Sequence, residues 1–185
     1  IDNNIAIGYQ SLTMADFGST GSRVAKRNIA IGSYALNSTG TNSQTGTVAI
    51  GYEALTALTS GGSNTAIGNE ALSTLTTGSG NTAVGYQALR LSDGADSNQT
   101  AIGSEALENS TTGTNTAVGA AAMKWVDDGS ANVAVGYLAM TSAGADAGNT
   151  ASDNVAIGKS ALAAITDGYS NVAIGSSAGI AMTTG

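Results

Sequence analysis

Hydrophobic and polar positions recur along the chain in one short pattern. An Asn is followed by a variable residue, Ala, Ile or Val, and Gly, and then by two variable residues, Ala, and Leu or Met. A polar segment that often contains Thr-Gly completes the unit. The motif glycine occurs ten times, at Gly8, Gly32, Gly51, Gly68, Gly85, Gly103, Gly119, Gly136, Gly158 and Gly175. We therefore interpret residues 1–185 as a single repeat domain of ten repeats, each roughly seventeen residues long.

Two successive repeats carry the motif without interruption. Their structural positions are Asn64, Ala66, Ile67, Gly68, Ala71 and Leu72 in one copy and Asn81, Ala83, Val84, Gly85, Ala88 and Leu89 in the next. The first Ala, the Ile or Val beside it and the glycine are kept in all ten copies, and Asn in eight, with Thr47 and Gln99 as the exceptions.

The repeat predicts an all-β chain, a parallel β-solenoid of about ten coils. A helix pair is excluded because helical repeats need about 33 residues or more. Residues 65–67 alternate between faces and carry two β-branched side chains, as in a short strand. Each coil should contain this strand, a tight Gly corner, a second short strand at x-Ala-Leu, and a polar return. Ten coils stacked about 4.8 Å apart give a rod on the order of 50 Å long.

Alternation along the strands predicts which columns face inwards. Small Ala should fill the narrow interior, Asn should form a hydrogen-bonded ladder, and the Ile/Val and Leu/Met columns should face the other way. The alternative is that Leu and Ile are interior and Ala lines the outside. A continuous exposed Ile/Leu stripe favours association. A closed homotrimer is the simplest fibre geometry that would bury it.

Composition removes several classes of function. The chain has no Cys, His or Pro, and its net charge is −7 with only 10% charged residues. A Cys-ligated metal site is excluded, the usual general base is absent, and nucleic acid is a disfavoured partner. No apolar run approaches the roughly 18 residues that a membrane span needs, so we expect no membrane insertion of this segment. We expect no catalytic residue and no enzyme activity.

The repeats resemble those of a known class of protein. The segments at residues 64–72 and 81–89, joined by a Thr-Thr-Gly, resemble bacteriophage tail-fibre repeats. They are also similar, more distantly, to the head repeats of YadA-like trimeric autotransporter adhesins. The resemblance covers essentially the whole chain. It implies a trimeric left-handed β-roll, side by side or intertwined, that is extracellular and serves attachment to a host surface.

Acidic segments are the first candidate binding sites. Asp93 to Asp96, Asp127-Asp128-Gly129 and Asp146 to Asp153 could supply oxygen ligands to calcium. Asp-Gly is also ordinary turn chemistry, and the Gly-Gly-x-Gly-x-Asp signature of calcium β-rolls is absent. We therefore expect no cofactor, with calcium as the one alternative. Carboxylates that share a repeat position, such as Glu53, Glu70 and Glu105, should stack along one outer face.

Aromatic residues are the second candidate. Tyr residues follow the motif glycine in four repeats, at Tyr9, Tyr52, Tyr86 and Tyr137, while Trp125 and Tyr169 fall in return segments. Aromatic rings are common contact platforms, so Trp125 and Tyr169 are possible surface contacts. The alternative is that the rings pack over the corners and stack on neighbouring coils.

Three functions remain open. The first is a shaft or head of a trimeric bacteriophage tail fibre that attaches the virion to a host receptor or glycan. The second is a bacterial surface adhesin or extracellular filament component. The third is a solenoid that binds ice or polysaccharide, although its Thr residues form one column where ice binding predicts two. The chain starts within a repeat, so we interpret it as a fragment of a longer fibre. The two longest intervals between motif glycines, near Arg23 and residues 143–153, place insertions in the return, where recognition loops are expected.

Overall fold

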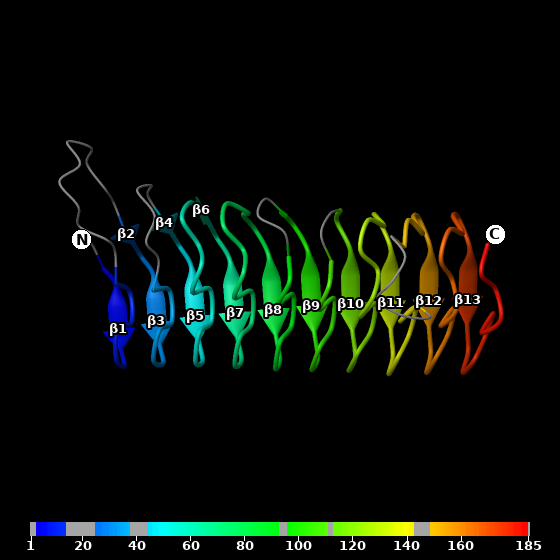
Figure 1. The fold of residues 1–185 in the computed structure, drawn as a ribbon, viewed down its shortest axis with the longest axis horizontal. Coiled ribbons are helices and arrows are strands. Elements are labelled where there is room, and N and C mark those ends of the chain that lie inside the picture. The colour runs from blue at the N-terminus through cyan, green and yellow to red at the C-terminus, as the bar shows by residue number, and fades with distance from the viewer. Residues whose placement is uncertain are drawn as a thin grey trace.

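The structure is a computed structural model that describes residues 3–13, 25–37, 44–92, 96–110, 113–142 and 149–184. These residues form strands and turns and no helix. Successive coils lie side by side along one axis and form an extended rod (Figure 1). The predicted parallel β-solenoid is confirmed. Residues 14–24, which include Arg23 of the first insertion, and residues 143–148 of the second lie outside the described residues.

In the described part of the chain, thirteen short strands form two parallel sheets. The main sheet has the order β1-β3-β5-β7-β8-β9-β10-β11-β12-β13, and the smaller one the order β2-β4-β6. The main-sheet strands are β1 (Ile5–Ile7), β3 (Ile29–Ile31), β5 (Val48–Ile50), β7 (Thr65–Ile67), β8 (Thr82–Val84), β9 (Thr100–Ile102), β10 (Thr116–Val118), β11 (Val133–Val135), β12 (Val155–Ile157) and β13 (Val172–Ile174). The smaller sheet contains β2 (Ala25–Lys26), β4 (Gln44–Thr45) and β6 (Gly61–Gly62).

Each main-sheet strand pairs in register with the same repeat positions in the next coil. Ala66 of β7 lies beside Ala83 of β8, with Thr65 beside Thr82 and Ile67 beside Val84. Ala66 and Ala83 are fully buried, while Ile67 is 37% exposed. The predicted inward Ala column and outward Ile/Val column are therefore both confirmed.

The Leu/Met column was predicted to face outwards, and that prediction is wrong. Ala71 and Leu72 follow one another and are both fully buried, as are Ala88 and Leu89 in the next coil. The predicted second strand is absent here, because φ is positive at alternate residues, 56° at Glu70 and 52° at Leu72. Without an extended backbone, successive side chains do not alternate between faces. The alternative interpretation was correct for Leu and wrong for Ala and Ile.

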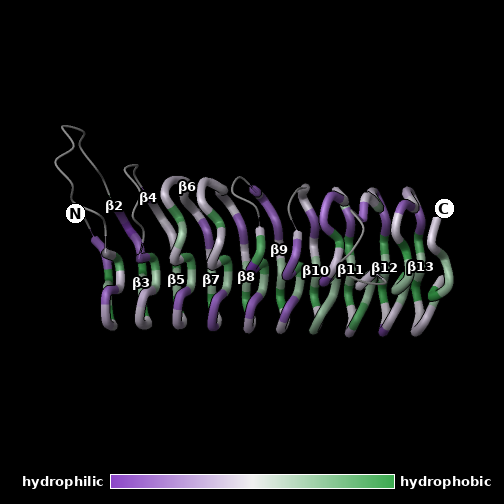
Figure 2. The backbone as a smooth tube through the Cα atoms, in the orientation of Figure 1, coloured by the Kyte–Doolittle hydropathy of each residue, from purple (hydrophilic) through white to green (hydrophobic). Residues whose placement is uncertain are grey.

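A further apolar column comes from the return, which the sequence suggested was polar. Three residues after the Leu/Met position, six described copies place a fully buried side chain. It is apolar in four of them, at Leu58, Leu75, Val126 and Ile165, and Ser in the other two, at Ser92 and Ser110. Figure 2 shows hydrophobic positions recurring in successive coils along the rod. The interior is thus filled by one Ala column from the strand and, from the segment after the Gly corner, by a second Ala column and two columns that hold mostly larger apolar side chains. We call the strand the first limb of the coil and the segment after the corner the second limb.

The motif glycines stack directly on each other at the corner. Gly68 has a φ of +142°, and a Cβ added there would lie 2.2 Å from the carbonyl oxygen of Gly85. Only glycine adopts this backbone region readily, and only a residue without Cβ leaves room for the next coil. The predicted Gly corner is confirmed, with close coil packing as a second reason for it.

The Asn column forms the predicted ladder. The backbone N–H of Asn81 donates to Asn64 Oδ1 at 2.9 Å, and Asn81 Nδ2 donates to the Asp96 carbonyl at 2.7 Å. Each Asn thus joins the preceding coil to its own and also closes its own coil. The two exceptions leave buried polar atoms without a hydrogen bond, Oγ1 of Thr47 and Nε2 of Gln99. Elsewhere the Asn side chain fills this position with an amide whose oxygen and nitrogen are both hydrogen-bonded.

Candidate functional site

The outer face of the main sheet is the first candidate for an interaction surface. We define the outer face as the first and third side chains of each main-sheet strand. The third position is Ile or Val in all ten strands, and the first is Ile, Val or Thr. Exposure is 49% for Ile5 and 59% for Ile7 at one end of the rod, and 71% for Val172 and 68% for Ile174 at the other. Between the ends, the third-position side chains range from half-buried to 41% exposed at Ile102. The outer face is therefore a β-branched strip along the whole sheet, apolar at its third position throughout and at its first position outside β7 to β10.

Tyr side chains lie next to this strip, at the corner. Tyr9, Tyr52, Tyr86 and Tyr137 are all between 45% and 64% exposed. Tyr34, one position later in its repeat, stands edge-on to Tyr9 with ring centroids 5.5 Å apart and to Tyr52 with centroids 6.0 Å apart. A side-chain hydrogen bond with Glu53 raises the pKa of Tyr52 above its usual value. Tyr9 and Tyr52 thus contact Tyr34 of the coil between them edge to face, and their exposed area is also available for contact.

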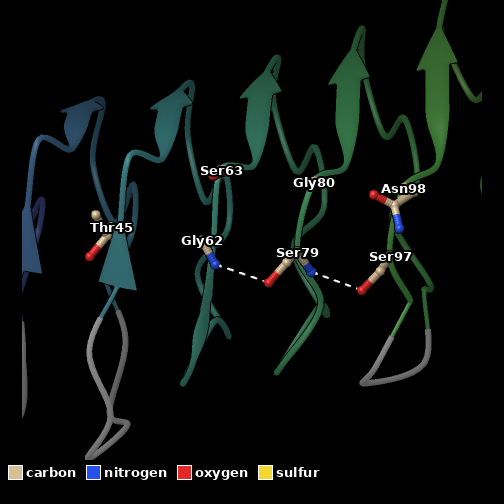
Figure 3. Close-up of a pocket in the computed structure, with 7 residues that line it drawn as sticks. All are labelled: Thr45, Gly62, Ser63, Ser79, Gly80, Ser97 and Asn98. Atoms are coloured by element: carbon tan, nitrogen blue, oxygen red, sulfur yellow. Dashed lines mark hydrogen bonds between the residues drawn. The ribbon is translucent and has the colours of Figure 1, made fainter.

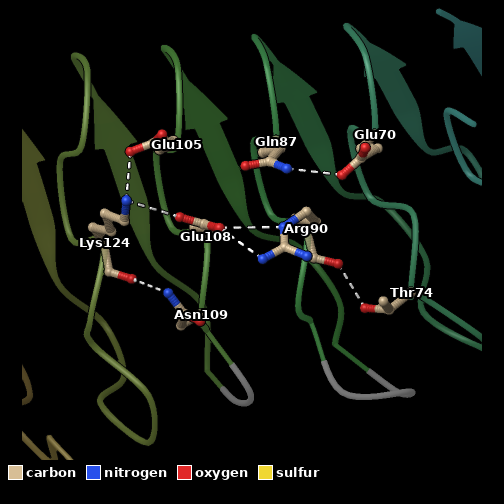
Figure 4. Close-up of polar contacts among 8 residues, drawn as sticks. All are labelled: Glu70, Thr74, Gln87, Arg90, Glu105, Glu108, Asn109 and Lys124. Carbon is tan, nitrogen blue, oxygen red and sulfur yellow. Dashed lines mark hydrogen bonds and ion pairs between the residues drawn. The ribbon is translucent and has the colours of Figure 1, made fainter. Parts of the chain in front are cut away.

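Charged side chains form a ladder on the limb opposite the strands (Figure 4). Arg90 Nη2 lies 2.9 Å from Glu108 Oε1, and Lys124 Nζ lies 3.1 Å from Glu108 Oε2 and 2.5 Å from Glu105 Oε2. Nearer the N-terminus on the same limb, Gln87 Nε2 donates to Glu70 Oε2 at 2.8 Å. Glu70 and Glu105 thus pair with neighbours of other types, in addition to sharing one repeat position.

The two predicted contact residues have different surroundings. Trp125 is half-buried, and Lys124 Nζ lies 5.0 Å from the centroid of its ring, within cation–π range. Tyr169 is 66% exposed at the far end of the return. Trp125 is therefore partly engaged inside the chain, whereas Tyr169 presents most of its surface to solvent.

A shallow hollow of about 500 Å³ lies beside the smaller sheet (Figure 3). It is lined by Thr45, Gly62, Ser63, Ser79, Gly80, Ser97 and Asn98. Two of the hydroxyls already accept hydrogen bonds from the backbone. Gly62 N–H donates to Ser79 Oγ at 3.2 Å, and Ser79 N–H donates to Ser97 Oγ at 3.0 Å. The lining offers hydroxyl and amide groups and contains neither an aromatic ring nor a charge, unlike the groove that polysaccharide processing would require.

The acidic segments are only partly described. Asp93 and Asp146 lie outside the described residues, and Asp96 is buried. Burial raises the pKa of Asp127, and the neighbouring charge of Asp128 raises it further. Among the described residues, no three His, Cys, Asp or Glu side chains gather where they could hold a metal ion.

The structure brings the repeat positions of two neighbouring coils together as columns. Asn64 and Asn81, Ala66 and Ala83, and Gly68 and Gly85 each meet their counterpart directly. The backbone N–H of Leu72 donates to the Ala88 carbonyl at 3.0 Å, which joins the second limbs. Sequence reasoning missed Leu75 and the ion ladder, although apolar residues at Leu58, Leu75 and Ile165 were a visible signal.

Within the described ranges, no helix is long and apolar enough to cross a membrane. Comparisons of the sequence with family models and with curated proteins, and of the structure with solved structures, found no match.

Proposed function

We propose that this chain is a rod segment of a trimeric extracellular fibre used for host attachment, in the first place a bacteriophage tail fibre. The observation that carries the proposal is the outer face. It is apolar at its third position in every coil, and each of these ten side chains is exposed or half-buried in a single chain, none of them buried. An apolar strip of this length indicates an interaction surface.

A copy of the same chain is the partner that fits this surface. All ten strands run in the same direction, so a rotation axis along the rod brings matching coils of several chains to one level. The strip is about 45 Å long and about 10 Å wide, so three copies would bring together about 1,400 Å². The likeness to trimeric fibre and adhesin repeats favours three copies.

The mass of the recombinant chain in solution tests the assembly. We expect three times the 18.0 kDa chain mass by light scattering. Replacing Ile67 and Ile102 with Lys on the outer face should give a monomer with an unchanged circular dichroism spectrum. Asn69→Lys, at an exposed corner position, is the control and should stay trimeric. A monomeric or dimeric parent chain would contradict the proposal.

Immunogold electron microscopy tests the particle that carries the fibre. An antibody against the segment should place gold on phage tails in the source culture. Gold on cell envelopes or free filaments would instead select the adhesin or filament, and Trp125 and Tyr169 would become the first contacts to mutate.

A further inference from the structure

Four consecutive strands interrupt the apolar character of the outer face. Thr occupies the first outward position in β7, β8, β9 and β10, at Thr65, Thr82, Thr100 and Thr116. We call these four residues the Thr block. On one side the same column continues as Val48, Ile29 and Ile5, and on the other as Val133, Val155 and Val172.

The Thr block is continuous and sharply bounded in the sheet. Thr65, Thr82, Thr100 and Thr116 are direct neighbours in the strand pairing, while Val48 borders the block at one end and Val133 at the other. All four Thr side chains are half-buried on the outer side of the sheet. The third position of the same strands remains Ile or Val. The outer face therefore has one polar stretch, in one column, over the middle of the rod.

Apolar columns alone cannot fix how identical rods align along their axis. A shift of one coil, about 4.8 Å, places Ile or Val against Ile or Val again and loses only one coil of contact. A Thr hydroxyl is more demanding, because it is both donor and acceptor, and loses binding energy when buried without a partner. Thr against Thr can pair, whereas Thr against Val cannot.

We propose that the Thr block sets the axial register between copies of this chain. In the aligned arrangement all four Thr levels meet Thr of the neighbouring copies. A shift by one coil brings Thr116 of one copy against Val133 of its neighbour, and Thr65 of that neighbour against Val48. Single polar positions set register in coiled-coil interfaces by the same physics. The inference rests on the proposed assembly of several copies through the outer face.

The test moves the block by one coil and keeps the composition. A variant carrying Val48→Thr and Thr116→Val still has four consecutive Thr, in β5, β7, β8 and β9. This variant should assemble with itself as the parent does, because the Thr residues of its copies still lie opposite one another in every coil. The parent and the variant, distinguished by a mass tag, are unfolded together, refolded together and counted by native mass spectrometry. A parent chain with two different tags is the control and should give the statistical 1:3:3:1 mixture.

Mixed assemblies of parent and shifted chains carry Thr against Val at two levels when their coils are aligned, and they lose one coil of contact when one chain slides to match the two Thr blocks. We expect them to fall about tenfold below the statistical proportion. A statistical mixture of the two chains would overturn the inference. If the parent stays monomeric, the proposed function fails first. If parent and variant each form trimers that mix freely, the assembly stands and the register role of the Thr block does not.

Discussion

In β7, Ala66 is fully buried while Ile67 beside it is 37% exposed, whereas a few residues later Ala71 and Leu72 are both fully buried. The two limbs of one coil thus treat an Ala followed by a large apolar residue in opposite ways. The first limb is extended, and its side chains alternate. The second takes positive φ at Glu70 and Leu72, which turns successive side chains to the same side. The backbone conformation, and not hydrophobicity, decides which large residues remain for an interface.

The corner that separates the limbs gives the largest expected effect. Gly68→Ala should destabilise the chain by about 4 kcal/mol, because the added Cβ would lie 2.2 Å from the Gly85 carbonyl oxygen at a φ of +142°. Urea denaturation followed by circular dichroism measures the loss.

Gly46→Ala is the control for the corner. Its φ is +67°, but the nearest atom to an added Cβ is Ser63 Oγ, at 3.9 Å. Left-handed strain alone should cost about 1 kcal/mol. Equal losses at Gly46 and Gly68 would show that coil stacking does not require the corner glycine.

The second prediction compares the two large apolar columns. Leu72→Ala should cost about 3 kcal/mol in the unfolding free energy, because Leu72 is fully buried in the core. Ile67→Ala should cost well under half of that in a chain kept monomeric by Lys substitutions elsewhere on the outer face, Ile102→Lys among them. In the assembled chain, Ile67→Ala should instead weaken association, seen as a mass that falls on dilution. A larger monomer loss at Ile67 than at Leu72 would reverse the assignment of inside and outside.

The Asn ladder gives the third prediction, because it joins the start of the first limb to the end of the return. Asn81→Ala should cost about 2 kcal/mol, since the Gln99 N–H and the Asp96 carbonyl would lose their side-chain partner. Thr47→Asn should raise stability by about 1 kcal/mol by restoring the ladder at a natural break. Denaturation midpoints of both variants measure these opposite changes, and a destabilising Thr47→Asn would contradict the role given to the Asn amide.

The ion ladder on the second limb gives the smallest effect. The hydrogen bond that Lys124 Nζ donates to Glu105 is the largest cause that raises the Lys124 pKa, so the contribution of this pair to stability is complete below the lysine pKa of about 10.4 in the unfolded chain. The contribution disappears as pH rises through the raised folded pKa. Lys124→Met should cost about 0.5 kcal/mol at pH 7, less at high salt, and nothing once the lysine is neutral. Lys159→Met, at an exposed corner position, is the matched control and should show no such pH dependence.

Sequence reasoning succeeded where the extended backbone made it valid. The spacing of Gly68 and Gly85 defined the coil, and alternation placed Ala66 inside and Ile67 outside. It failed at Leu72, because no rule of alternation applies to a backbone with positive φ at non-glycine residues. It also missed the contact of Arg90 with Glu108, which are 18 residues apart and meet only because the coils stack.

The stacking direction has a mechanical consequence. The hydrogen bonds between coils run along the rod axis, so a pull on the two ends loads them one coil at a time. Seventeen residues separate Thr65 from Thr82, and when detached and stretched they reach roughly 58 Å, against a rise of about 4.8 Å in the folded rod. The rod would therefore lengthen in steps under tension and dissipate a sudden pull, coil after coil, before the chain is fully taut.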